Sequence, residues 1–195
     1  KKLNSIVEIG PGMGILTQHL INSKTKTYFI EIDKESITYL NNVFPEIKDS
    51  IINEDFLKID LAQFKAPIGL IGNFPYNISS QILFKLIENR EKIEELVGMF
   101  QFEVAKRICA PPGSKTYGIL SVLVQAFYSA EFLFALSPHH FNPPPKVNSG
   151  VIKLTKKNTQ FLDCDEKLFF KIVKTSFQQR RKTLRNSLKS FNLPI

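Results

Sequence analysis

Short apolar segments alternate with helix-like segments over the first two thirds of the 195-residue sequence. These apolar segments centre on Ile6, Tyr28, Ile51, Leu70 and Val97. Because parallel strands are joined by crossovers that are usually helical, the alternation predicts an α/β fold with a mostly parallel sheet and helices on both faces. Residues 131–136 and 150–154 are two further strand-like segments on either side of a proline-rich turn. We expect them to form an antiparallel edge, which gives seven strands in all.

The first strand-like segment runs directly into a glycine-rich turn. Gly10, Gly12 and Gly14 follow residues 7–9, and a helical pattern begins at Ile15. Glycines at the end of a strand let the backbone approach a ligand closely. The G-x-G-x-G spacing differs from the G-x-G-x-x-G spacing of nicotinamide-binding loops, and Glu8 lies two residues before the first glycine. This pattern favours S-adenosylmethionine as the cofactor.

Acidic residues end the next two expected strands. Glu31 follows the second strand, where a carboxylate can accept both hydroxyls of a ribose. Asp33 is a rival for this role, but we expect it to be the N-cap of the following helix. At the end of the third strand, Asp55 could accept from an adenine amino group while Phe56 lies against the ring. Three successive strand ends therefore carry residues suited to one ligand.

A polar and aromatic turn, NFPYN at residues 73–77, follows the fourth strand. The exocyclic amine of adenine is a weak nucleophile, so an enzyme that acts there must accept both N–H groups and hold the base flat. The Asn73 carbonyl could accept one N–H, a backbone carbonyl held by the fixed φ of Pro75 could accept the other, and Tyr76 could stack on the base. The alternative is an ordinary strand-to-helix turn, in which Asn73 caps the helix and Tyr76 packs.

Four segments together resemble the bacterial small-subunit ribosomal RNA dimethyladenosine transferases. They are EIGPGMG at 8–14, NFPYNIS at 73–79, FNPPPKVNS at 141–149 and QRRKTLRN at 179–186. The resemblance covers almost the whole chain and implies a Rossmann-like class I methyltransferase fold. The sequence departs from the family in having Phe74 where leucine is common, and in lacking the Gln-His-Phe element before the first strand. It begins without methionine and stops just after a basic segment, so we expect an incomplete C-terminal part.

The resemblance also assigns roles to individual residues. It matches Gly10, Gly12, Glu31 and Asp55 to the cofactor, Asn73 and Tyr76 to the target amine, and Phe141 to an aromatic ring that closes over a flipped adenine. We expect the target site to be Asn73, Tyr76 and Phe141. We expect the cofactor site to be Glu8, Gly10, Gly12, Glu31, Ile32, Asp55, Phe56 and Asn73. Packing of Phe141 in the core is the alternative, since the chain has 17 phenylalanines.

The remaining composition argues against several other classes of protein. No segment approaches the roughly 18 apolar residues of a membrane span, and no signal peptide is visible, so we expect a cytoplasmic protein. Cys109 and Cys164 form no C-x-x-C pair. The three histidines, His19, His139 and His140, show no spacing typical of metal ligands. We therefore expect no metal.

The positive charge is confined to the C-terminal end. Residues 1–149 hold 15 Lys/Arg and 15 Asp/Glu, so the remaining 11 Lys/Arg and 3 Asp/Glu of residues 150–195 account for the whole net charge of +8. We expect a methyltransferase domain at 1–155 and a small basic helical domain at 156–195. Its Arg181, Arg185 and Lys189 are spaced by four and should share one helix face. A basic face of this kind suits RNA phosphates. The expected RNA contacts are Arg180, Arg181, Lys182, Arg185 and Lys189.

These observations lead to one functional hypothesis and three alternatives. We expect S-adenosylmethionine-dependent N6,N6-dimethylation of adjacent adenines near the 3′ end of small-subunit (16S) ribosomal RNA, within an assembling 30S particle. S-adenosylhomocysteine would be the product. The first alternative is a large-subunit ribosomal RNA adenine methyltransferase of the macrolide-resistance type. The others are a noncatalytic ribosome-assembly or transcription factor on the same fold, and a nicotinamide oxidoreductase.

Overall fold

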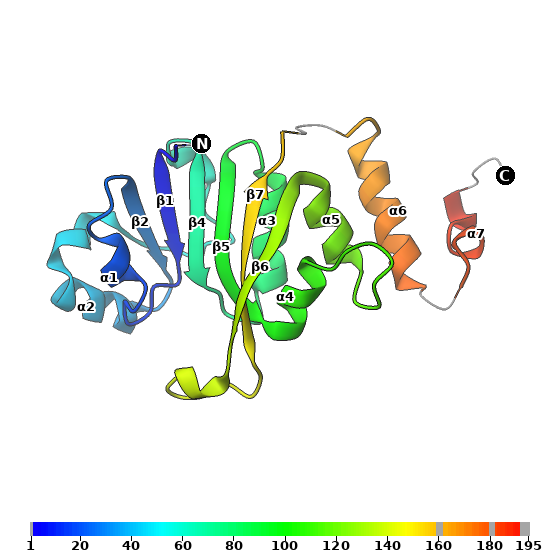
Figure 1. The fold of residues 1–195 in the computed structure, drawn as a ribbon. Coiled ribbons are helices and arrows are strands. Elements are labelled where there is room, and N and C mark those ends of the chain that lie inside the picture. Colours follow the sequence, from blue (N-terminus) through cyan, green and yellow to red (C-terminus); the bar gives the residue numbers. More distant parts are fainter. Residues whose placement is uncertain (1, 159–161, 180–181, 192–195) are drawn as a thin grey trace.

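The computed structural model describes residues 2–158, 162–179 and 182–191. Its strands form one sheet in the order β3-β2-β1-β4-β5-β7-β6 (Figure 1). They are β1 (Ser5–Ile9), β2 (Lys26–Glu31), β3 (Ile51–Asn53), β4 (Ile68–Asn73), β5 (Ile93–Gln101), β6 (Tyr128–Leu136) and β7 (Ser149–Lys156). The first five strands pair in parallel, and β7 is antiparallel to both β5 and β6. The prediction of a mostly parallel seven-stranded sheet with an antiparallel edge is confirmed.

Helices connect the strands and cover the sheet. They are α1 (Thr17–Leu20), α2 (Lys34–Val43), α3 (Ser79–Glu88), α4 (Phe102–Ile108), α5 (Ile119–Phe127), α6 (Glu166–Gln178) and α7 (Leu184–Ser187). α3, α5 and α6 lie side by side (Figure 1). Asp33 caps α2 as predicted, because its carboxylate accepts from the Ser36 backbone N–H at 2.8 Å. In the described residues, no helix is long and apolar enough to cross a membrane.

The prediction that Arg185 and Lys189 share one helix face is wrong. α6 ends at Gln178, α7 is a separate short helix that begins after Thr183, and Lys189 lies in the 3-10 helix Lys189–Phe191. Thr183 acts as an N-cap, since its hydroxyl accepts from the Asn186 backbone N–H at 3.4 Å. A cap at this position starts a new helix, so Arg185 and Lys189 do not share the face of α6. Arg181 lies outside the described residues.

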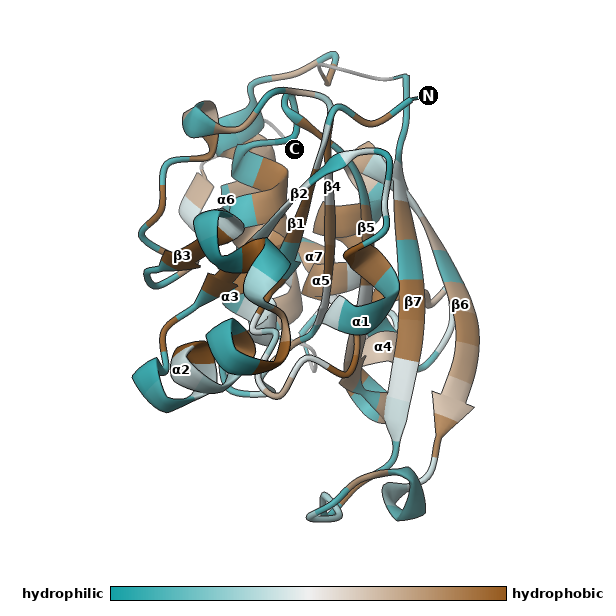
Figure 2. Ribbon diagram, turned by 90° about the vertical axis from the view of Figure 1, so that its left-hand side faces the viewer, coloured by the Kyte–Doolittle hydropathy of each residue, from teal (hydrophilic) through white to brown (hydrophobic). Residues whose placement is uncertain are grey.

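The hydrophobic core lies between the sheet and the helices that pack on it, and Figure 2 shows hydrophobic segments (brown) on both the strands and the helices. Phe74, just after β4, is 1% exposed and meets Phe100 edge to face with ring centroids 5.2 Å apart. Its ring occupies the space that side chains at Gly72 and Gly98 would need. The buried ring of Phe74 therefore anchors the turn after β4 to the hydrophobic core.

The parallel strands β1 to β5 all end at the same edge of the sheet, which is the lower edge in Figure 1. The connection between β6 and β7 projects beyond that edge. In sheets of this kind, ligands bind outside the carboxyl ends of the strands. The topology therefore places the glycine turn, the ends of β2 and β3, the turn after β4 and the β6–β7 connection around one region.

Candidate functional site

The glycine turn after β1 leaves open space in front of its backbone. Gly10 and Gly12 have φ values of +66° and +54°, which residues with a side chain rarely adopt. A Cβ atom at either position would have no neighbour within 4 Å. Gly14 differs, because a Cβ atom there would collide with the ring of Phe44. Gly10 and Gly12 thus provide an unobstructed backbone surface at the edge of the sheet, whereas Gly14 is required for packing.

Glu31 ties this turn to the end of β2. One carboxylate oxygen accepts from the Gly12 N–H at 3.0 Å, and the other accepts from the N–H groups of Ile32 and Asp33 at 2.8 and 2.9 Å. A carboxylate has about four acceptor sites, so these three bonds leave one site for a ligand hydroxyl. Accepting both ribose hydroxyls, as predicted, would require a backbone donor to move. The neighbouring Ile32 is 66% exposed and offers apolar surface at the same edge.

Glu8 lies beneath the glycine turn rather than in it. Its side chain is 1% exposed, and its carboxylate accepts from the Thr17 hydroxyl of α1 at 2.9 Å. Burial raises the pKa of Glu8 from 4.5 to about 7, the Thr17 hydrogen bond lowers it, and the nearby Glu31 carboxylate raises it further. Direct contact between Glu8 and the cofactor, as predicted, conflicts with this burial. The structure instead makes Glu8 a link between β1 and α1.

Asp55 and Phe56, after β3, are placed differently from each other. Asp55 is half-buried, and its carboxylate accepts from the Leu57 N–H at 2.9 Å. Phe56 is 4% exposed and packs in the core, with the Lys85 ammonium 5.3 Å from its ring centroid. This burial does not support the prediction that the ring lies against an adenine. Residue type alone could not separate a ring that faces the core from one that faces a ligand.

Asn73 and Tyr76 both lie in the turn between β4 and α3. Asn73 is exposed, and its side chain has no hydrogen-bond partner in the described part of the chain. It does not cap α3, whose N-cap position is occupied by Ile78 without a side-chain bond. The Tyr76 hydroxyl lies 2.8 Å from the Ser149 hydroxyl of β7, a residue 73 positions away that is fully buried. No local pattern in the sequence points to Ser149, because only the fold brings these two residues together.

Phe141 follows the short 3-10 helix Pro138–His140 in the β6–β7 connection. It is half-buried and does not belong to the hydrophobic core of the described residues. The cofactor candidates follow β1, β2 and β3, whereas this connection lies beyond β5 in the strand order. β4, which ends in Asn73, lies between the two groups. Phe141 therefore approaches this edge from the side opposite the glycine turn, as the target-site hypothesis requires.

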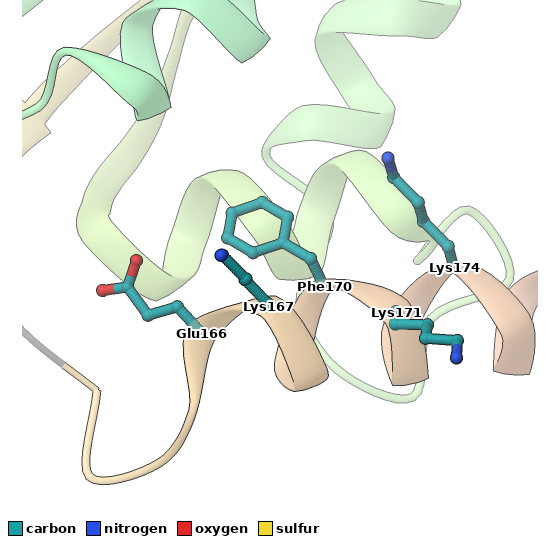
Figure 3. Close-up of a pocket in the computed structure, with 5 residues that line it drawn as sticks. All are labelled: Glu166, Lys167, Phe170, Lys171 and Lys174. Carbon is teal, nitrogen blue, oxygen red and sulfur yellow. The ribbon is translucent and has the colours of Figure 1, made fainter. Parts of the chain in front are cut away.

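The C-terminal basic residues are described only in part. Arg180 and Arg181 lie outside the described residues, whereas Lys182, Arg185 and Lys189 are exposed. The structure adds a hollow of about 470 Å³ along α6, which is shown in Figure 3. It is lined by Glu166, Lys167, Phe170, Lys171 and Lys174. The spacing of these lysines by four and three residues would have indicated a shared helix face.

An ion pair and an aromatic stack hold α6 against the rest of the molecule. Glu166 pairs with Arg90 at 2.6 Å, and Phe170 stacks on Phe127 with ring centroids 6.4 Å apart. The expected domain boundary after residue 155 falls at the end of β7, and α6 packs directly on α5. In the described residues, no group of three or more His, Cys, Asp or Glu side chains could hold a metal ion.

Known proteins are similar to this chain in both sequence and fold. A family model described as ribosomal RNA adenine dimethylase matches residues 1–193. A ribosomal RNA small subunit methyltransferase A from Flavobacterium johnsoniae is 58% identical over 195 residues, which cover 99% of this chain and 75% of that protein. A dimethyladenosine transferase from Plasmodium falciparum superimposes with a TM-score of 0.82 at 32% identity, over 95% of this chain and 67% of that one.

A third protein is similar in fold alone. The 23S rRNA methyltransferase ErmE superimposes with a TM-score of 0.77 at 24% identity, over 95% of this chain and 75% of that one. The family match spans nearly the whole chain, and the relative of 58% identity is covered over three quarters of its length. The chain belongs to the ribosomal RNA adenine dimethylase family.

Proposed function

We propose that this protein transfers methyl groups from S-adenosylmethionine to the N6 atoms of two adjacent adenines near the 3′ end of small-subunit (16S) ribosomal RNA. The activity would contribute to small-subunit maturation in the cytoplasm, with an assembling 30S particle as substrate. Family membership and the relative of 58% identity support this choice of reaction and RNA. The single observation that carries it is structural: the open glycine turn and the exposed Asn73 lie at the ends of neighbouring strands, β1 and β4.

The residues around the glycine turn suit S-adenosylmethionine. The open backbone at Gly10 and Gly12 can accommodate the amino acid portion, and the remaining acceptor site on Glu31 can take a ribose hydroxyl. Ile32 offers apolar surface and Asp55 offers a carboxylate for the adenine portion. When bound, the cofactor supplies an electrophilic methyl group on sulfur. The protein's task is then to orient a weak nucleophile toward it.

The turn after β4 would orient the target amine. The Asn73 side-chain carbonyl accepts one N6–H of the extruded adenine, and a neighbouring backbone carbonyl accepts the other. Tyr76 stacks on one side of the base, and Phe141 closes over it from the β6–β7 connection. S-adenosylmethionine would supply its methyl group to this amine and leave as S-adenosylhomocysteine, and the amine would release its excess proton to solvent. Orientation and charge placement supply the catalysis.

The direct test uses both ribosomal subunits. The protein is incubated with labelled S-adenosylmethionine and with undermethylated small or large subunits, and the modified adenines are mapped. We expect dimethylated adenines only in the small-subunit RNA. Modification of large-subunit RNA would favour the macrolide-resistance type of enzyme. RNA binding without any methyl transfer would favour the noncatalytic assembly factor.

A variant separates the chemistry from cofactor binding. Asn73→Ala should abolish methyl transfer but leave the affinity for S-adenosylmethionine, measured by calorimetry, nearly unchanged, because we place Asn73 mainly against the target base. Asn42→Ala, on the exposed surface of α2, is the matched control and should retain full activity. Normal turnover by the Asn73 variant would contradict this mechanism.

A further inference from the structure

A second hollow opens beside the expected target site. It has a volume of about 370 Å³ and forms where β5 passes into α4 and where residues 146–148 lead into β7. Its lining includes Gln101, Phe102, Lys146, Val147 and Asn148. The volume lies within the range of about 300–1,000 Å³ that is typical of small-ligand pockets. Part of its lining, Pro138 and residues 146–148, belongs to the β6–β7 connection, which projects from the lower edge of the sheet in Figure 1.

One residue, Ser149, connects the hollow to Tyr76, the tyrosine that we expect to stack on the target base. Gln101 pairs with Ser149 in the register of β5 and β7, and the Ser149 hydroxyl lies 2.8 Å from that of Tyr76. The backbone N–H of Phe102 donates to the Asn148 carbonyl at 2.9 Å, which holds the two walls of the hollow together. Ser149 therefore separates the hollow from the place where the target adenine would stack.

The side chains that line the hollow present groups suited to a nucleotide. Within the described ranges, the side-chain amides of Gln101 and Asn148 have no hydrogen-bond partner, and each carries both donors and an acceptor. Val147 is 43% exposed and, with the half-buried Phe102, offers apolar surface. Lys146 is exposed and, in the same part of the chain, forms no ion pair. Glu103 and Pro138 complete the lining, and the exposed Glu103 carboxylate confines a phosphate to the side of Lys146. The amide groups, the apolar surface and Lys146 together match a base and its phosphate.

We propose that this hollow binds the nucleotide next to the target adenine and that it selects adenine at that position. The inference rests on the proposed function and deepens it. Asparagine and glutamine amides pair with the N6 and N7 edge of adenine, and such edges are accessible when RNA bases are unstacked. Lys146 binds the adjoining phosphate. An adjacent, unmodified adenine can then occupy the hollow while the adenine in the target site is modified.

The test measures how the flanking base affects methylation of one adenine. Undermethylated small subunits are prepared with either adenine or cytosine next to a fixed target adenine, and kcat/KM is measured for each. For the unaltered protein we expect a preference for the flanking adenine of roughly 5- to 150-fold, the discrimination that one bidentate pair provides. The double variant Gln101→Leu/Asn148→Ala should lose most of this preference.

Two controls make the result interpretable. The matched variant Gln81→Leu/Asn42→Ala changes the same residue types at exposed positions on α3 and α2, and it should keep the preference. The affinity of each variant for S-adenosylmethionine, measured by calorimetry, should match that of the unaltered protein. If the unaltered protein methylates both substrates equally, or if Gln101→Leu/Asn148→Ala keeps the preference, the hollow does not read the flanking base. If the unaltered protein methylates neither substrate, the proposed function itself is wrong.

Discussion

Glu8 is a buried residue whose ionisation affects the stability of the fold. The pKa of its carboxyl group is raised from 4.5 to about 7, mainly by burial. The folded protein therefore holds this proton more tightly than the unfolded chain, so the contribution of Glu8 to the free energy of unfolding falls as the pH rises from 4.5 through 7. Between pH 5 and pH 8 the loss should amount to roughly 2–3 kcal/mol.

The variant Glu8→Gln tests this dependence, because glutamine keeps the size and the acceptor for Thr17 but does not ionise. The difference in the free energy of unfolding between the variant and the unaltered protein should shift by that amount in favour of the variant from pH 5 to pH 8. Urea unfolding at the two pH values measures the difference, in which the other titrating groups cancel. A difference that is independent of pH would show that Glu8 ionises normally.

At the scale of elements, Phe74 fixes the turn that carries Asn73 and Tyr76. A Cβ atom at Gly98 of β5 would lie 2.8 Å from Cζ of the Phe74 ring and closer still to Cε2, so Gly98→Ala should overpack this site. We expect a loss of about 1–3 kcal/mol in the free energy of unfolding. Adding Phe74→Leu should recover part of the loss, since leucine leaves more room. If the two substitutions are simply additive, the ring and the glycine are not coupled.

The hydrogen bond between Tyr76 and Ser149 joins two further elements, the turn after β4 and the start of β7. Because Ser149 is fully buried, its hydroxyl can hold the tyrosine ring in one orientation. Tyr76→Phe keeps the ring and removes the bond, and Ser149→Ala removes it from the other side. A double-mutant cycle on unfolding should give a coupling energy of about 0.5–1.5 kcal/mol.

The same two variants should also slow methyl transfer while leaving the affinity for S-adenosylmethionine unchanged. Single-turnover rates and calorimetry measure the two effects separately. Ser129→Ala, at an exposed position of β6, is the control for the serine substitution. Unchanged rates in both site variants would mean that the bond supports the fold without positioning the ring.

The elements that the sequence predicts well are those set by local pattern. The strands, the cap at Asp33 and the glycine turn follow from residues close together in the chain. What the sequence could not predict depends on contacts between distant residues. The Tyr76–Ser149 bond spans 73 positions. Phe56 is buried in the core, although it follows the carboxyl end of β3, where a ligand is expected to bind. The break after α6 follows from a local signal, since Thr183 is a residue type that favours the N-cap position and it caps α7.

At the scale of the whole molecule, the net positive charge is concentrated at the C-terminal end of the chain. Residues 1–149 carry 15 basic and 15 acidic side chains, whereas residues 150–195 hold the entire net charge of +8. We propose that this basic end binds the RNA backbone and places the target, while the turn after β4 acts on the base. Phosphate contacts position a nucleic acid but carry no sequence information. Base selection is then left to the edge of the sheet.

The charge division predicts a specific salt dependence of RNA binding. Lys182, Arg185 and Lys189 are exposed, so replacing all three with glutamine should remove phosphate contacts and disturb the core little. Each lost contact should reduce the slope of log K against log salt by roughly 0.7 to 0.9. Binding to small-subunit RNA at several salt concentrations gives this slope, and cofactor affinity should not change.

A matched control removes the same charge elsewhere. Lys24, Lys48 and Lys65 are exposed shortly before β2, β3 and β4, and replacing them with glutamine lowers the net charge equally. If binding depends on local contacts, this control variant should keep a slope close to that of the unaltered protein. At physiological ionic strength, salt screens the interaction between exposed charges that are more than about 8–10 Å apart. Equal reductions in both variants would mean that RNA responds to the total charge of the molecule rather than to its basic end.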